Sequence, residues 1–150
     1  MTTYATGTYG SALALLACAL LAPLTACQPT GDSRCDAFPD AVAVITVQGY
    51  DLDCNPSVIR CSSKALACTV PSEATVYVWP ERVVTLRYDA YMHRVLLHEA
   101  GHTLGYWPEW LAELYAFCHM PNRERVQLNA WVVNPATGRW PVQGDCWRVA

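Results

Sequence analysis

The stretch His98-Glu99-Ala100-Gly101-His102 decides how this chain of 150 residues is interpreted. Residues four apart on an α-helix lie about 40° apart around the axis and about 6 Å apart along it. His98 and His102 can therefore aim both imidazoles at one metal ion, and Glu99 is placed to take a proton from a water molecule beside that ion. The alternative is an amphipathic surface helix with two unrelated histidines and a solvated carboxylate. The spacing favours the metal site.

The pentapeptide resembles the HExxH motif of the zincin metallopeptidases. Its flanks add to the likeness, because apolar residues precede it at 95–97 and Thr-Leu-Gly follows it at 103–105, as in many zincins. The resemblance implies a Zn²⁺ ion held by His98 and His102, which lowers the pKa of a bound water molecule and polarises a substrate carbonyl. Glu99 is then the expected general base of peptide-bond hydrolysis, and the expected partner is a peptide or protein substrate.

A catalytic zinc site needs three protein ligands and one open position. In metzincins the third ligand is a histidine at a position that is Pro108 here, and proline has no donor atom. Gluzincins take a glutamate from the next helix, and Glu113 lies in an apolar stretch at 111–117, where an unpaired carboxylate would be costly. Residues 113–121 (ELYAFCHMP) also resemble the glutamate helix of short bacterial and phage zincins. We therefore predict the metal ligands His98, His102 and Glu113, with Glu109 and His119 as alternatives for the third.

The first residues of the chain indicate export. Residues 11–24 form an uncharged apolar run that is too short to span a bilayer but suits the core of a signal peptide. It ends in Leu-Thr-Ala-Cys at 24–27, which resembles the lipobox of bacterial lipoproteins, where the cysteine becomes the first mature residue and carries a lipid. Residues 1–10 contain no Lys or Arg, so an ordinary cysteine near a conventional cleavage site is the alternative. We predict a signal peptide over 1–26, a tether over 27–40 lipidated at Cys27, and attachment to the bacterial cell envelope.

The cysteine count favours the same compartment. Besides Cys18 in the apolar run and Cys27, six cysteines remain. An even number in a short exported domain is typical of a disulfide framework, here three bridges with 15 possible connectivities. A structural zinc site is less favoured, because the spacing of Cys54, Cys61 and Cys68 lacks the C-x-x-C pattern. We expect the disulfides to hold together one domain over 41–150.

The remaining periodicity predicts an α+β fold. The apolar positions of 88–104 follow a helical pattern that carries the motif, and a shorter helix follows over 109–118. The resemblance to zincins implies a small domain in which the HExxH helix and this second, ligand-bearing helix pack on a short sheet.

The strand predictions rest on β-branched and alternating residues. The run at 41–47 predicts a buried strand, and 74–79 predicts a strand near a sheet edge because Pro80 follows it. No regular element is predicted over 51–69. The last prediction is a C-terminal β-hairpin, with arms at 125–133 and 138–149 around a turn at 134–138.

Charge excludes one class of partner. The net charge of −3 comes from scattered residues, with no basic stripe for nucleic acid. The predicted function is zinc-dependent hydrolysis of a peptide bond, in which the strand at 75–79 pairs with an extended substrate if it borders the cleft. Two other classes stay open. One is a catalytically inactive zinc-binding lipoprotein, and the other is a disulfide-stapled envelope lipoprotein that acts as a binding module.

Overall fold

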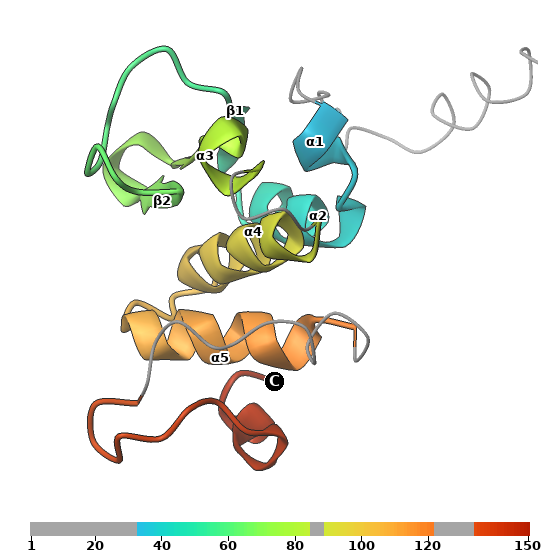
Figure 1. The fold of residues 1–150 in the computed structure, drawn as a ribbon, viewed down its shortest axis with the longest axis vertical. Coiled ribbons are helices and arrows are strands. Elements are labelled where there is room, and N and C mark those ends of the chain that lie inside the picture. The colour runs from blue at the N-terminus through green and yellow to red at the C-terminus, as the bar shows by residue number, and fades with distance from the viewer. Residues whose placement is uncertain (1–32, 85–88, 122–133) are drawn as a thin grey trace, which may run out of the picture.

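The computed structural model describes residues 33–84, 89–121 and 134–150. Helix α4 (Asp89–Thr103) lies between the sheet with α2 (Pro39–Val47) on one side and α5 (Glu109–His119) on the other (Figure 1). The C-terminal segment packs on α5 through the 3₁₀ helix η2 (Gln143–Arg148). The molecule is therefore a small mixed α+β domain, which confirms the α+β class of the prediction. The other elements are α1 (Ser33–Asp36), β1 (Asp51–Cys54), β2 (Ala67–Val70), the 3₁₀ helix η1 (Pro71–Glu73), β3 (Thr75–Val78) and α3 (Pro80–Val84).

The two helices predicted around the motif are confirmed. α4 ends because Gly105 adopts a left-handed conformation with φ of +92°, which glycine tolerates best. The N–H of Gly105 donates to the carbonyl of His102 at 2.9 Å, and the N–H of Tyr106 donates to the carbonyl of Gly101 at 3.0 Å. These two bonds form a Schellman motif, and the turn that follows starts α5 only a few residues later. The short connection places the first turn of α5 beside the last turns of α4.

The sheet has the strand order β1-β3-β2, with β1 parallel and β2 antiparallel to β3. β3 was predicted near an edge, but it is the middle strand and is bonded on both sides. Pro80 follows it as the first residue of α3, where the missing N–H of proline removes no helical hydrogen bond. The prediction of no regular element over 51–69 is also wrong, because β1 and most of β2 lie there. Both strands are only four residues long and carry too little pattern to be recognised.

Residues 41–47 are helical, so the predicted buried strand is wrong. Pro39 is at the start of α2, where its fixed φ suits a helix. Ala41 and Ile45, four residues apart, are fully buried on one face of the helix. The hydroxyl of Thr46 donates to the carbonyl of Val42 at 3.0 Å. A short apolar run does not distinguish a buried strand from a helix, and here packing against α4 overrides the β propensity of its branched residues.

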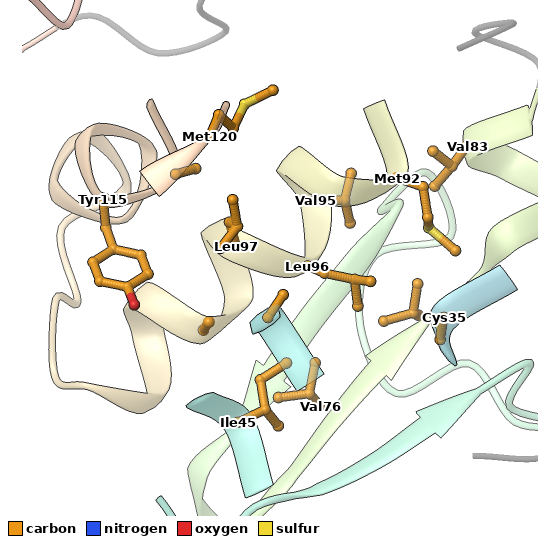
Figure 2. Close-up of a cluster of buried hydrophobic side chains, with 14 of the residues drawn as sticks. Cys35, Ile45, Val76, Val83, Met92, Val95, Leu96, Leu97, Tyr115 and Met120 are labelled. Carbon is orange, nitrogen blue, oxygen red and sulfur yellow. The ribbon is translucent and has the colours of Figure 1, made fainter. Parts of the chain in front are cut away.

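The core forms around α4. Leu96 and Leu97 are buried, with Val76 of β3, Ile45 of α2 and Tyr115 of α5 in the same cluster (Figure 2). Burying aliphatic side chains of this size stabilises a fold by about 1.5–3 kcal/mol each. The core therefore fixes the position of α4 relative to both α5 and the sheet.

The prediction of three disulfides is confirmed. They join Cys35 to Cys54, Cys61 to Cys68 and Cys118 to Cys146, with Cα–Cα distances of 6.5, 6.5 and 5.6 Å. The first ties α1 to β1, the second closes the loop before β2, and the third ties the end of α5 to η2. Such bridges are typical of exported proteins, since cytosolic thiols are kept reduced.

The C-terminal hairpin is not formed as predicted. A turn is present at 134–138, where the N–H of Gly138 donates to the carbonyl of Asn134 at 2.8 Å. The second arm, however, is an irregular segment followed by η2, and not a strand. The disulfide of Cys146 holds this segment against α5, and Pro141 and Gly144 interrupt a strand pattern. The first arm lies outside the described residues.

The folded part begins before residue 41. Cys35, inside the stretch predicted as a tether, is fully buried in the core, and α1 and the start of α2 also belong to the domain. The predicted signal peptide and the lipid site at Cys27 lie outside the described residues. Among the helices that the structure describes, none combines the length and the apolar character needed to cross a bilayer.

Candidate metal centre

A close approach of two helices builds the site. A Cβ added to Gly101 would lie 3.0 Å from the Cα of Ala112 in α5, tighter than nine in ten Cβ contacts, so one of the two helices would have to shift. Glycine at this position therefore allows α5 to lie directly on the last turns of α4. Because α5 begins at Glu109, this contact carries the Glu109 side chain to the histidine face of α4.

His98 and His102 lie together on α4, as the four-residue spacing predicts. Their ring centroids are 4.9 Å apart, and the rings are nearly perpendicular. Nδ1 of His102 donates to the carbonyl oxygen of Tyr106 at 3.0 Å, so its Nε2 keeps a lone pair. Trp107 stacks on the His102 ring at 5.6 Å. Burial and the neighbouring His98 lower the pKa of His102, which favours the neutral, metal-binding form of the imidazole.

Glu109 is the carboxylate that meets both imidazoles. Its Oε2 lies 3.1 Å from Nε2 of His98, and its Oε1 lies 3.7 Å from Nε2 of His102. His98 beside it holds the pKa of this carboxyl below its usual range, so Glu109 is ionised at neutral pH. One atom from each of the three residues lies within 4.8 Å of the others, which brings them close enough to hold one metal ion. His98, His102 and Glu109 are called the metal-binding group below, as the residues that could hold such an ion.

Glu113, the glutamate predicted as third ligand, is not part of this group. Its carboxylate is fully buried and forms an ion pair with Arg94. Its Oε2 lies 3.3 Å from Nδ1 of His98, which is the opposite side of the ring from Glu109. The prediction rested on the cost of burying a carboxylate without a partner, which a metal ion would remove. A buried arginine removes the same cost.

Glu99 lies beside the two histidines and is almost fully buried, at 6% exposure. The hydroxyl of Thr69 in β2 donates to its Oε2 at 2.7 Å. Burial raises the pKa of Glu99 to about 6, although His98 and the hydrogen bond from Thr69 act in the opposite direction. A carboxylate with a pKa close to neutrality is suited to accept and release a proton.

Thr69 is the site residue that the sequence did not reveal. It is 30 residues from Glu99 in the chain, in a stretch for which no strand was predicted. A lone threonine carries no spacing signal, so only the fold brings it to the site.

The other two histidines of the chain lie elsewhere. His93 contacts the start of α2, where its Nε2 lies 2.8 Å from the carboxylate of Asp40 and its ring stacks on Phe38. His119, the other alternative third ligand, donates from Nδ1 to the carbonyl of Tyr115 and stacks on the ring of that residue. Within the described part of the chain, neither belongs to the metal-binding group.

A cleft of about 330 Å³ opens over the group. One wall is β2, an edge strand of the sheet, and the other is the histidine face of α4 with the start of α5. The lining combines apolar and ionisable side chains: Leu66, Ala67, Cys68, Thr69, Val95, His98, Glu99, His102, Trp107 and Glu109. An apolar cleft with a few convergent polar groups is the usual form of a small-molecule or peptide site.

No protein-family model, curated protein or solved structure matches this chain.

Proposed function

We propose that the protein is a zinc-dependent peptidase of zincin type. The observation that carries the proposal is the meeting of His98, His102 and Glu109 in one cleft beside the buried carboxylate of Glu99. Two imidazoles and a carboxylate are a common ligand set for catalytic zinc. A general base within the same cleft is what hydrolysis requires in addition to the metal ligands.

Glu109 is the proposed third ligand in place of Glu113. It directly follows Pro108, which stands where metzincins carry their third histidine. Its carboxylate faces Nε2 of both histidines, and its side chain is 68% exposed at the mouth of the cleft. When bound here, Zn²⁺ would supply a Lewis acid for the scissile carbonyl and lower the pKa of a water molecule.

The chain's own groups would handle the proton. Thr69 orients Glu99 by donating to Oε2, which leaves Oε1 of the carboxylate for the attacking water. Glu99 would accept a proton from this water and then deliver it to the amine of the leaving group. With a pKa near 6, the carboxylate is largely ionised at neutral pH before it takes the proton.

The substrate is proposed to lie along β2. Residues 75–79 were expected to pair with it, but β3 is bonded on both sides and has no free edge. Among the residues that the structure describes, β2 is bonded to β3 on one side only, and three of its residues line the cleft. An extended peptide can add to such an edge by backbone hydrogen bonds.

The proposed place of action is the bacterial cell envelope. The three disulfides are typical of an oxidising, exported environment. The likeness of residues 24–27 to a lipobox supports attachment through a lipid on Cys27.

Zinc content and peptide cleavage test the proposal together. The purified protein should bind one Zn²⁺ per chain, measured by native mass spectrometry, and should cleave members of a broad peptide library. Glu99→Gln should keep the zinc and lose peptide cleavage. Glu81→Gln, the same change in the first turn of α3, is the matched control and should retain both zinc and cleavage. Zinc without cleavage of any peptide would favour the inactive zinc-binding lipoprotein. Absence of zinc would favour the disulfide-stapled binding module.

A further inference from the structure

We infer that Glu113 and Arg94 form a buried positioning pair that fixes His98 for metal binding. The inference rests on the proposed metal site, and it assigns Glu113 a role other than that of a ligand. It also explains why two oppositely charged residues are buried between α4 and α5.

The geometry places both residues on one side of His98. Arg94 is one helical turn before His98 on α4, and its side chain is only 4% exposed. Nη2 of Arg94 pairs with Oε1 of Glu113, and Oε2 of Glu113 lies 3.3 Å from Nδ1 of His98. The carboxylate therefore joins the guanidinium to the imidazole.

The charges decide which way the hydrogen bond runs. Burial lowers the pKa of Arg94 to about 10, which still leaves the guanidinium charged at neutral pH. A guanidinium only donates hydrogen bonds, so Glu113 meets Arg94 as a carboxylate acceptor in the ion pair. An ionised Glu113 only accepts hydrogen bonds, so Nδ1 of His98 must be the donor. With Nδ1 committed to Glu113, Nε2 is the nitrogen of His98 that is left to bind a metal ion, and it lies 3.1 Å from Oε2 of Glu109 across the cleft.

The same geometry argues against Glu113 as a ligand. The metal-binding group meets at the Nε2 side of His98, and Glu113 lies at the Nδ1 side. One of its oxygens is also engaged by Arg94. A carboxylate on the second nitrogen of a ligating histidine sets the orientation and tautomer of the ring, and its removal lowers metal affinity by roughly 10–100-fold.

The test compares variants that remove the pair without leaving a lone buried charge. Arg94→Met/Glu113→Met removes both charges and the acceptor, whereas Arg94→Met/Glu113→Gln keeps an amide oxygen near His98. Zinc affinity is measured by competition with a chromophoric chelator, and folding is measured by thermal unfolding without metal. We expect the Met/Met variant to fold and to bind zinc about 10–100-fold more weakly. The Met/Gln variant should recover part of the lost affinity.

Glu113→Asp provides a second route if the double variants do not fold. It keeps the charge near Arg94 but withdraws the carboxylate from His98 by one methylene, so zinc affinity should fall to an intermediate value. Asp40→Asn is the matched control, because it alters the carboxylate partner of His93, a histidine of α4 outside the metal-binding group, and zinc affinity should not change.

The visible spectrum of the Co²⁺-loaded protein separates a positioning role from a ligand role. Removing a positioning residue leaves the number of ligands unchanged, so Arg94→Met/Glu113→Gln should keep the wild-type absorption bands.

Changed bands in this variant, with bands retained in Glu109→Gln, would make Glu113 the ligand and overturn the inference. Zinc affinity at the wild-type value in both Met/Met and Glu113→Asp would also overturn it. If the wild-type protein itself binds no zinc, the proposed function fails first, and this inference fails with it.

Discussion

Two histidines of α4 each pair with a carboxylate of another helix, and the two pairs have different surroundings. His93 with Asp40 is a closed pair: the imidazole is 6% exposed, stacks on Phe38 and ties α4 to α2. The pair of His98 with Glu109 lies at an open cleft, where a second histidine and a second carboxylate converge on the same space. Both places hold an imidazole beside a carboxylate. Convergence of several donors on a cavity, and not the presence of a histidine beside an acid, distinguishes a site from a structural pair.

The strongest test of this comparison removes one member of the convergent group. His102→Ala leaves two ligands for the ion, so stoichiometric zinc should be lost and peptide cleavage should become undetectable. Native mass spectrometry and a fluorogenic peptide assay measure the two effects. His93→Gln, made in the closed pair, should keep its zinc. Full zinc occupancy in His102→Ala would remove the basis of the zincin proposal.

Glu99→Gln tests the proton acceptor apart from the metal. The amide has nearly the same shape as the carboxylate but cannot take a proton, so turnover should fall by roughly 10²-fold or more for a general base. Zinc content should be unchanged, because Glu99 is not in the metal-binding group. Turnover within a few-fold of wild type would show that another group accepts the proton.

Gly101→Ala tests whether the contact between α4 and α5 positions Glu109. The added methyl would meet the backbone of Ala112 at 3.0 Å, and such overpacking costs about 1–3 kcal/mol of unfolding free energy. We also expect weaker zinc binding, because α5 must shift and carries Glu109 with it. Gly144→Ala is the control, since nothing lies within 4 Å of a Cβ added there. Urea unfolding and chelator competition measure both effects. Unchanged zinc affinity in a destabilised Gly101→Ala protein would separate the helix contact from the site.

Thr69→Val tests the orientation of Glu99 by the edge strand. The change keeps the shape of the side chain and removes the hydroxyl that donates to Oε2. A hydrogen bond to a charged group is worth about 1.5–3 kcal/mol, so a loss of about tenfold or more in kcat is expected at unchanged zinc content. Thr75→Val in β3, whose hydroxyl donates to a backbone carbonyl away from the cleft, should leave kcat unchanged. An effect on KM alone would assign Thr69 to substrate binding.

Much of the centre of the fold was predictable, because it depends on local spacing. These signals all lie within one short segment of the chain: the four-residue interval of His98 and His102, the glycine at 105 and the apolar positions of α4. α2 was misassigned, since an apolar run of seven residues fits a strand as well as a helix until its packing partner is known.

Two features of the site depend on tertiary contacts and could not be predicted: which glutamate faces both histidines, and the contact of Thr69 with Glu99. Glu109 and Glu113 are four residues apart and share a face of α5, so either could be expected to reach the metal. The choice depends on Arg94, which neutralises Glu113, and on Gly101, which brings α5 close enough for Glu109. Thr69 depends on the pairing of β2, which no local pattern indicates.

The smallest expected effect belongs to the closed pair and completes the comparison. Asp40→Asn removes the negative charge opposite His93 but keeps an oxygen within hydrogen-bond reach. Because the Asp40 side chain is 56% exposed, solvent screens the charge, and the unfolding free energy should fall by about 1 kcal/mol or less. Zinc affinity and kcat should remain at wild-type values, since the pair lies outside the metal-binding group. Urea unfolding, chelator competition and the peptide assay give the three readings. A fall in zinc affinity here would show that the two pairs are coupled through α4, and the distinction between a closed structural pair and an open site would then not hold.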